Sequence, residues 1–482
     1  MILTKLSRFS LLTVCLLGLW LVTADVRGGV ALTTLVSFTG TNGACPGANP
    51  YAGLVLGSDG NFYGTTTSGG TSNVGTVFQL TLGGNFTSLL SFNGSNGATP
   101  YAPLVQGADG NLYGTTFLGG SSNWGTIFQF STNGAFASLY SFTSTNNPRL
   151  GIDSAYLGAN PAAALVPAGD GSFYGTAGYG GAYTNAFQQG FGYGTVFQFT
   201  TNGNVTARAF FNKTNGSYSS GGMVPGKDGN LYGTTAFGGR NISPSFPGFG
   251  TVFKMTPDGT LTNIYLFTGN ADGGFIYAGL VQGRDGNLYG GAFNGGAQGY
   301  GTLFKVSTNG AFVLLHSFTF TESGSPYGGL MEGSDGNLYG TTFGTSGYGS
   351  VFQLTPDGSF RNLVFFNNAN GAKPDGVLVQ GPDNNFYGTT SLGGSNGLGT
   401  VFRLSMPLPP VIKTMVQTNG VAVFTWSAVA GQTYQPQYST NLAQTNWFVL
   451  VKPFVAANGT MTTTDVNAAG SSQRFYRVVL FP

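Results

Sequence analysis

Groups that could do chemistry are scarce in this chain. Its 482 residues include 16 acidic side chains, one histidine and two cysteines. Eleven of the acidic residues lie in expected turns, directly after the apolar N-terminal segment or in the C-terminal segment. Those that remain are Asp153, Asp272, Asp375, Glu322 and Glu332. None of these five is spaced along the chain as an acid–base pair, so the sequence favours a non-catalytic protein.

An enzyme remains the alternative. A lyase or a glycoside-active enzyme would use Asp153, Glu322, Glu332 or Arg149. Glycosidase chemistry requires two of the carboxyls within about 5–10 Å of each other. The one histidine, His316, lies in the apolar run Leu314–Phe318, where we expect it to pack or to lie at a rim.

Seven aspartates belong to a recurring turn. Asp59-Gly60-Asn61-Phe62-Tyr63-Gly64 returns, with small changes, from Asp109, Asp170, Asp228, Asp285, Asp335 and Asp383. Calcium takes six to eight oxygen ligands, so one carboxylate per turn is a poor cage. Asp-Gly and Asp-Gly-Asn are common turn sequences. We therefore expect these residues to form turns, and we expect no metal and no cofactor.

Composition narrows the function further. The net charge is +2 and no basic run occurs, which argues against nucleic acid as a partner. Charged residues make up 7% of the chain, against about 25% in ordinary proteins, and glycine takes 82 positions. At 14% aromatic residues the chain is not disordered.

The N-terminus is typical of an exported protein. Lys5 and Arg8 precede an apolar run from Phe9 to Val22, and Ala24 offers a cleavage site. Fourteen residues are short of the ~20 that a spanning helix needs, so residues 1–24 are expected to be a signal peptide, with no membrane span in the mature chain. Removal of this segment takes Cys15 with it, so we expect no internal disulfide at Cys45.

The turn belongs to a longer repeat. Each copy follows a short apolar run such as Gly279–Gln282 and precedes Gly-Thr-Val-Phe or a near variant. These segments are rich in Val, Phe, Tyr and Thr and are bounded by Gly, Asn and Asp, so they predict β-strands. One unit is then four strands, a to d, repeated every 48 to 61 residues. Four antiparallel strands at such a period predict a β-propeller blade.

The strand count predicts how the ring closes. Seven sets of strands a to c occur, but no d strand follows the seventh, which ends at Leu404. A d-type run, Leu32–Phe38, precedes the first set. We therefore expect an all-β, seven-bladed propeller over residues 30–404, with blade seven built from Val377–Leu404 and Leu32–Phe38. Two aromatic columns are expected to fill the core between blades, the turn tyrosines such as Tyr113 and the phenylalanines such as Phe128.

The repeat resembles a known family. DGNLYGTT, followed by GTVF and a Pro-Asp-Gly turn, is similar to the Gloeo-Verruco (GloVer) tandem repeat of exported bacterial proteins over residues 32–404. The resemblance implies a secreted or surface repeat protein and no particular activity. The turns alone also resemble those of streptogramin-lyase-like propellers, but this chain lacks the histidines that such a lyase would use.

A second unit is expected at the C-terminus. After a proline-rich linker, residues 405–411, the repeat stops. Residues 412–482 carry strand-like runs and the pattern Trp-Ser-Ala-Val-x-Gly-x-x-Tyr from Trp426, which resembles a fibronectin type III-like β-sandwich. Trp426, Tyr434, Trp447 and Tyr476 are its core candidates.

Loop lengths suggest where a ligand would bind. If strands alternate in direction, the b–c and d–a loops share one face, and all the long insertions fall there, in blades three and four. Aromatic residues gather on that face, in the inserted loops and before each Gly-Thr. The candidate ligand-binding residues are Trp124, Tyr179, Tyr183, Tyr193, Arg240, Phe249, Tyr300 and Tyr348. Alternatively, these rings cap the strand ends.

The sequence thus predicts a secreted or cell-surface, non-catalytic propeller, expected to be monomeric. Its partner would be an extracellular glycan or protein bound on the b–c/d–a face. A purely structural surface component is the third hypothesis.

Overall fold

The computed structural model describes residues 30–132, 134–143, 157–181, 192–240, 243, 246–345, 347–406, 410–440, 447–468 and 474–481. The structure is all-β: the described part of the chain contains no α-helix, and η2 (Phe320–Glu322) is a single 3₁₀ turn. The signal peptide predicted for residues 1–24 lies outside the described residues.

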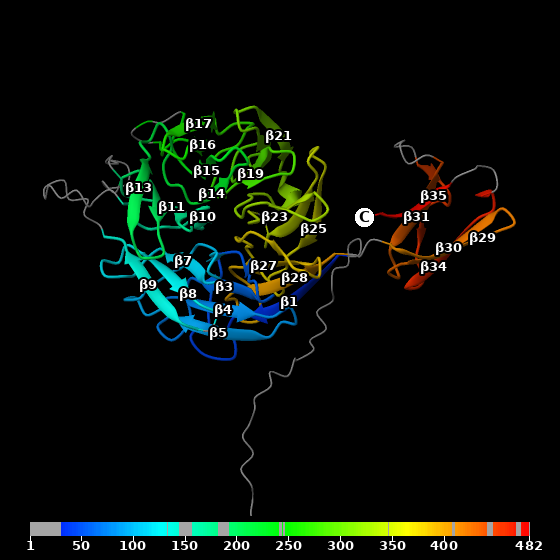
Figure 1. Cartoon of the computed structure of the whole chain (residues 1–482), viewed down its shortest axis with the longest axis horizontal. Helices are drawn as coiled ribbons and strands as arrows, with labels where there is room; N and C mark the ends of the chain where they lie inside the picture. Colours follow the sequence, from blue (N-terminus) through cyan, green and yellow to red (C-terminus); the bar gives the residue numbers. More distant parts are fainter. Residues whose placement is uncertain are drawn as a thin grey trace, which may run out of the picture.

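Up to Ser405 the described strands form seven antiparallel sheets of four strands each. Figure 1 shows them arranged around a common centre, as in a propeller. We number the sheets 1 to 7 in the order in which their innermost strands occur along the chain. These innermost strands are β2 (Val55–Leu56), β6 (Val105–Gln106), β10 (Val166–Pro167), β14 (Met223–Pro225), β18 (Val281–Gln282), β22 (Met331–Glu332) and β26 (Val379–Gln380). The second strands are β3 (Phe62–Thr66), β7 (Leu112–Thr116), β11 (Phe173–Ala177), β15 (Leu231–Thr235), β19 (Leu288–Ala292), β23 (Leu338–Thr342) and β27 (Phe386–Thr390). The third strands are β4 (Thr76–Leu80), β8 (Thr126–Phe130), β12 (Thr195–Phe199), β16 (Thr251–Met255), β20 (Thr302–Val306), β24 (Ser350–Leu354) and β28 (Thr400–Ser405). The outer strands of sheets 1 to 6 are β5 (Phe86–Ser91), β9 (Phe136–Ser141), β13 (Val205–Phe210), β17 (Leu261–Leu266), β21 (Phe312–Ser317) and β25 (Phe360–Phe365).

The outer strand of sheet 7 comes from the other end of the chain. β1 (Ala31–Ser37) pairs antiparallel with β28, and Figure 1 shows the two side by side. The β1–β28 register has a bulge between Thr34 and Val36, opposite Phe402 and Val401. The pair β4–β5 has its bulge at the same repeat position, between Val77 and Phe78. Since β1 reproduces even this irregularity, it takes the place of the missing outer strand, the pairing that the sequence predicted.

The innermost strands are shorter than the sequence suggested. The apolar run Gly53–Leu56 predicts a four-residue strand, but only Val55 and Leu56 pair with β3. An added Cβ on Gly53 would lie 2.4 Å from the carbonyl oxygen of Val377 in the neighbouring sheet. The chain ahead of this inner strand is thus crowded against the neighbouring sheet at the centre, where sheet pairing ends.

The phenylalanine column and six of the seven tyrosines fill the core, as expected. Phe78, Phe128 and their equivalents in the other sheets are fully buried, and so is Tyr113. The Tyr113 ring lies 4.6 Å from that of Phe173 in sheet 3, so the column joins adjacent sheets. In sheet 3 itself, Tyr174 is only partly buried.

The recurring turn is held by its aspartate. Asp109 accepts hydrogen bonds from the backbone N–H of Asn111 (3.1 Å), from the Asn111 amide (2.8 Å) and from the Tyr113 hydroxyl (2.7 Å). Partial burial by itself would raise the pKa of Asp109, but the hydrogen bonds from Tyr113 and Asn111 outweigh it, so the pKa is lowered. Burial and the bond to Asp109 raise the pKa of Tyr113 to about 12. We call this Asp–Asn–Tyr arrangement the turn network.

Residues beyond 410 form two small sheets around a separate core. β29 (Ile412–Thr418), β30 (Val421–Ser427) and β34 (Thr460–Asp465) make one sheet. β31 (Thr433–Ser439), β32 (Phe448–Val449), β33 (Phe454–Val455) and β35 (Phe475–Phe481) make the other. Trp426 and Tyr434 are fully buried between them, with Tyr476 packed alongside. Trp447 was expected in this core but lies under the Arg477 guanidinium, 4.3 Å from it, and takes no part in the core cluster.

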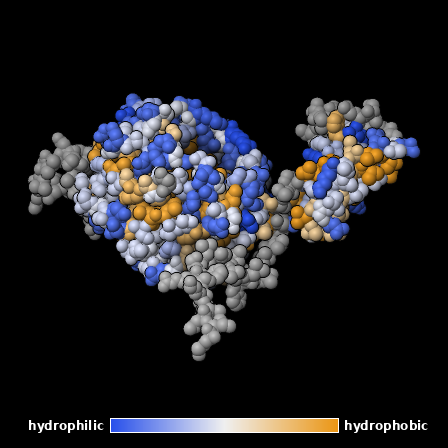
Figure 2. Space-filling model, turned by 60° about the horizontal axis from the view of Figure 1, so that its bottom comes forward, coloured by the Kyte–Doolittle hydropathy of each residue, from blue (hydrophilic) through white to orange (hydrophobic). Residues whose placement is uncertain are grey.

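Apolar residues also lie on the surface of this C-terminal unit. Met415, Val416 and Val455 are each more than half exposed. Figure 2 shows orange patches among hydrophilic residues on this unit.

Candidate functional site

The site is built from the segments that lead into the innermost strands. Each begins with a residue in the left-handed conformation, at φ between 54° and 62°: Asn49, Thr99, Asn160, Tyr218, Phe275, Ser325 and Lys373. The backbone N–H of each donates to a carbonyl of the preceding sheet, for example Asn160 to Trp124 (2.9 Å) and Lys373 to Tyr348 (2.8 Å). These bonds fix where the residues that follow are placed.

The glycine of Gly-Thr-Val-Phe permits this close approach. Gly125 has φ 99°, and an added Cβ would lie 2.3 Å from the carbonyl oxygen of Thr116 and 2.9 Å from Cδ of Pro161. Only glycine fits where two sheets meet at such distances.

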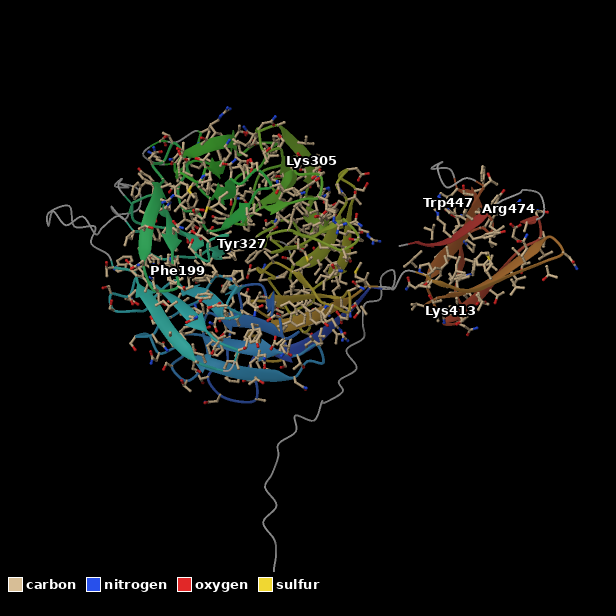
Figure 3. The ribbon with its side chains drawn as sticks, viewed as in Figure 1. Phe199, Lys305, Tyr327, Lys413, Trp447 and Arg474 are labelled. Carbon is tan, nitrogen blue, oxygen red and sulfur yellow. The ribbon has the colours of Figure 1, made fainter. Side chains whose placement is uncertain are left out.

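Two residues further along, the side chains reach the centre of the ring. At this repeat position, sheets 1 to 7 carry Tyr51, Tyr101, Ala162, Ser220, Tyr277, Tyr327 and Asp375. All seven line one pocket of about 390 Å³, which we call the axial pocket. Figure 3 places Tyr327 near the middle of the ring. The axial pocket therefore draws on every sheet.

Aromatic rings form much of its wall. Tyr277 and Tyr327 are stacked with their centroids 5.2 Å apart, and Tyr51 and Tyr101 lie 5.3 Å apart. Phe117, which follows β7, lies 5.3 Å from Tyr101 and also lines the pocket. Burial raises the pKa of Tyr51, Tyr101 and Tyr277, so these phenols stay protonated at neutral pH and present electron-rich faces.

Asp375 is the acidic side chain among the described pocket residues. It is 6% exposed, and neither carboxylate oxygen has a hydrogen-bond partner among the described residues. The nearby Ser391 hydroxyl donates instead to the Lys373 carbonyl (3.0 Å). Burial raises the pKa of Asp375 to about 7, against smaller opposing effects of Ser391 and Lys373. A buried carboxyl with such a pKa is a marker of functional sites.

The nearby ammonium group of Lys373 is bound by backbone carbonyls and not by Asp375. The ammonium of Lys373 donates to the carbonyls of Gly344 (2.6 Å) and Gly347 (3.1 Å) and lies 4.3 Å from the Phe343 ring centroid. Burial lowers the pKa of Lys373. Its charge acts on Asp375 from a distance, without an ion pair.

Seven of the eight residues that the sequence singled out are described, and none of the seven lines the axial pocket. Trp124, Tyr193, Phe249 and Tyr300 pack partly buried against the hydrophobic clusters between sheets. Their packing is what the capping alternative expects, and their carbonyls receive the N–H groups of the entering segments. Tyr183 lies outside the described residues.

Tyr179 is partly buried like these four, whereas Tyr348 and Arg240 are exposed. The Tyr179 ring lies 5.4 Å from that of Tyr218, which lines the axial pocket, so Tyr179 adjoins its edge. Tyr348 is 47% exposed. Arg240 lines a separate hollow of about 260 Å³ beside β17, with Tyr265 and Thr268.

Of the residues named for an enzyme, the two described glutamates each have partners of their own. Glu322 accepts from the Thr319 backbone N–H (2.8 Å) and is hydrogen-bonded to His316 (3.2 Å), whose ring stacks on Phe360. Glu332 lies 3.8 Å from the Arg284 guanidinium. Neither glutamate lines the axial pocket, and Arg149 and Asp153 lie outside the described residues.

Sequence reasoning missed the axial tyrosines, although a signal was present. From the sequence, Asp375 stood out only as one of the five acidic residues outside the expected turns. Aligning the residues before each inner strand would have shown Tyr in four repeats, with Asp, Ser and Ala in the others. Such variation at one position of a regular repeat is typical of a site rather than of a scaffold.

Comparison with known proteins identifies the repeat. A family model described as the Gloeobacter/Verrucomicrobia repeat matches residues 21–185, 183–346 and 245–446. No curated protein matches the sequence. None of the described residues belongs to a helix that could span a bilayer.

Several solved structures are similar in fold. The β-propeller domain of the Trilobed protease from Pyrococcus furiosus is 12% identical, with 72% of this chain and 89% of that one covered and a TM-score of 0.38. A polysaccharide lyase of family PL25, an ulvan lyase, is 9% identical over 79% and 91% of the two chains, with a TM-score of 0.41. A protein of unknown function from Dyadobacter fermentans is 10% identical over 77% and 98%, with a TM-score of 0.41. Because the sequence identities and TM-scores are this low, the similarity supports no conclusion about activity or ligand.

Proposed function

Since this chain belongs to the Gloeobacter/Verrucomicrobia repeat family, a family named for a sequence repeat and not for a reaction, we propose its function from the site itself: non-catalytic binding of a glycan in the axial pocket. The observation that carries the proposal is the joining of several tyrosines and one unpartnered carboxylate in a single pocket of about 390 Å³. That volume suits a small ligand or the end of a chain.

The chemistry of the wall supports a sugar. Sugar rings have apolar faces that stack on aromatic rings, and hydroxyls that bond polar groups. None of the hydroxyls of Tyr51, Tyr101, Tyr277 and Tyr327 bonds another described residue, so all four can bond a ligand. A protein partner, the other candidate from the sequence, would instead need a broad surface around the pocket.

The scaffold is part of the proposal. We infer that residues 30–404 form one seven-bladed β-propeller closed by β1. Residues 405–411 then act as a linker to a fibronectin type III-like sandwich, 412–482. We further infer a signal peptide at 1–24 and a secreted or surface-displayed protein, and the family match supports the inference of export. We also infer that the protein is a monomer.

In this proposal the eight residues that the sequence singled out have three roles. Tyr179 and Tyr348 would extend the site for a longer ligand. Trp124, Tyr193, Phe249 and Tyr300 would hold the entering segments in place, since their rings pack between sheets. Tyr183 and Arg240 would serve ligands that reach out towards sheets 3 and 4.

One observation favours an enzyme as the second candidate. A buried carboxyl with a pKa near 7 is matched to acid–base work at neutral pH, and a tyrosine hydroxyl could be its partner. If the protein is a lyase or glycosidase, new chain ends will appear when it is incubated with polysaccharides at pH 7, and Asp375→Asn will abolish them. Binding without any cleavage supports the binding role.

A glycan array with the full chain and the double variant Tyr277→Leu/Tyr327→Leu tests the proposal. We expect the parent to bind a defined set of glycans and the variant to lose at least tenfold in affinity for them. Tyr140→Leu, a change on the outer strand β9 at a residue that lines neither the axial pocket nor the Arg240 hollow, is the matched control and should bind like the parent. Equal binding by parent and double variant would place the ligand elsewhere, and no glycan binding at all would favour the purely structural role.

A further inference from the structure

Asp375 breaks the repeat at the position where four other sheets carry tyrosine. Its sheet lies between sheets 6 and 1, so its neighbours at this position are Tyr327 and Tyr51, and its charge acts on both phenols. A buried carboxylate is costly unless it is protonated or paired. With neither oxygen hydrogen-bonded to a described residue, its partner is to be sought in the ligand.

The charges around Asp375 favour a cation. The described lining of the axial pocket contains no Lys, Arg or His. The ionisable groups facing Asp375 are the phenols of the pocket and, from outside the lining, Lys373. Because Lys373 already donates to two carbonyls and lies over Phe343, it does not take the place of a counter-ion in the pocket.

The rings around the carboxylate favour the same charge. Tyr277 and Tyr327 are stacked on one side, and Tyr51 and Tyr101 lie against each other on another. The face of an aromatic ring attracts a cation within about 6 Å of its centroid. A charged hydrogen bond to a carboxylate is about twice as strong as a neutral one.

We propose that the axial pocket selects a ligand whose entering end carries an ammonium group, namely a sugar with a free, protonated amine, bound by Asp375 and the tyrosine faces. The inference rests on the proposed function and narrows its ligand class. An N-acetylated or purely neutral sugar lacks the charge that the carboxylate and the rings attract.

Isothermal titration of the full chain with two oligosaccharides of equal length tests this selection. One is made of glucosamine and the other of N-acetylglucosamine, so they differ in the charge on nitrogen. We expect the free-amine oligomer to bind about tenfold or more tightly. Asp375→Asn should abolish that preference and change binding of the N-acetyl oligomer less than twofold. Asp383→Asn, which removes a carboxylate from the turn at the other end of the same strand, is the matched control and should keep the preference.

A second probe separates the titration of Asp375 from that of the amine. Choline carries a permanent charge, so its binding should follow the carboxylate alone. Between pH 6 and pH 8 its affinity should rise about tenfold, as a group with a pKa near 7 becomes ionised. The affinity of Asp375→Asn for choline should be low and independent of pH. Thermal unfolding of each variant checks that it is folded.

The outcomes are distinguishable. Equal affinity for the two oligomers, or a preference that survives Asp375→Asn, overturns the inference. If neutral glycans bind and the tyrosine variant loses them, the proposed function stands without the inference. If choline binds through Asp375 but no oligosaccharide binds, recognition of an ammonium group by the pocket is supported. The proposal that the ligand is a glycan is then wrong. If neither probe binds, the inference is overturned.

Discussion

Asp375 and Asp383 lie on either side of the same inner strand, β26 (Val379–Gln380), yet their carboxylates are in opposite situations. Asp383 accepts hydrogen bonds from the Asn385 backbone N–H (3.2 Å), the Asn385 amide (2.7 Å) and the Tyr387 hydroxyl (2.8 Å). Despite some opposing burial, these bonds lower its pKa. Asp375 has no such partner among the residues that the structure describes, and burial raises its pKa to about 7.

The same difference holds around the whole ring. At the turn end every sheet has an aspartate, and in six of the seven sheets the aspartate binds its Asn and Tyr. At the pocket end the equivalent position varies between Tyr, Ala, Ser and Asp. Positions that repeat without change satisfy their own polar groups and hold the sheets together. At the varied position the Asp375 carboxylate has no hydrogen-bond partner among the described residues, which leaves it available to a ligand.

Tyrosine to alanine changes test this contrast with the largest expected effect. Tyr113→Ala removes a fully buried ring that packs on Phe173, and should lower the free energy of unfolding by about 3–5 kcal/mol. Tyr101→Ala removes a ring that is 37% exposed in the pocket, and should cost about 1 kcal/mol or less. Urea unfolding of both variants measures the difference. Similar losses would mean that the pocket ring is structural.

The pH dependence of stability tests the two aspartates. A carboxyl whose folded pKa is raised favours the folded state fully below its unfolded pKa of 3.8, and this contribution is lost as the pH rises through about 7. Relative to Asp375→Asn, the parent should therefore lose about 4 kcal/mol between pH 4 and pH 8, at about 1.4 kcal/mol per pKa unit. Urea unfolding at both pH values checks this. A difference between parent and variant that does not change with pH contradicts it.

Much of the fold was predictable because the repeat fixes it. A turn signal at Asp109, strand-forming residues such as Tyr113 bounded by glycine and asparagine, and the count of strands led to four-stranded sheets and to the pairing of β1 with β28. The short inner strands were not predictable, because crowding between sheets at the centre, as at Gly53, ends their pairing.

The site was predictable only in part. The sequence indicated the face formed by the b–c and d–a loops, and the axial pocket is lined by the ends of those connections. It did not indicate that Tyr51 and Tyr327, some 276 positions apart in the chain, line one pocket, because that depends on the sheets circling a common centre. The aromatic residue before Gly-Thr, such as Trp124, was predicted to bind a ligand because of its residue type. Its position between sheets depends on three-dimensional packing, which the sequence alone does not reveal.

Removing one hydroxyl tests the comparison with a smaller effect. Tyr113→Phe keeps the ring but deletes the hydrogen bonds with Asp109 (2.7 Å) and Gln129 (2.9 Å), and should cost about 1 kcal/mol. Tyr327→Phe deletes a hydroxyl that bonds no other described residue, and should leave stability unchanged within about 0.5 kcal/mol. Thermal or urea unfolding distinguishes them, and a loss in Tyr327→Phe equal to that in Tyr113→Phe would show that the pocket hydroxyls are structural.

The smallest effect is expected at Asp383, and its sign is the reverse of that at Asp375. Because the pKa of Asp383 is lowered, its contribution to folding is present above the unfolded value of 3.8 and is lost as the pH falls below it. The carboxylate is exposed, so solvent screens it and the contribution should stay below about 1 kcal/mol. In urea unfolding between pH 5 and pH 2, Asp383→Asn should lose slightly less stability than the parent, whereas Asp375→Asn differs from the parent mainly above pH 4. If both substitutions shifted stability in the same direction with pH, the two ends of β26 would not differ as the hydrogen bonds indicate.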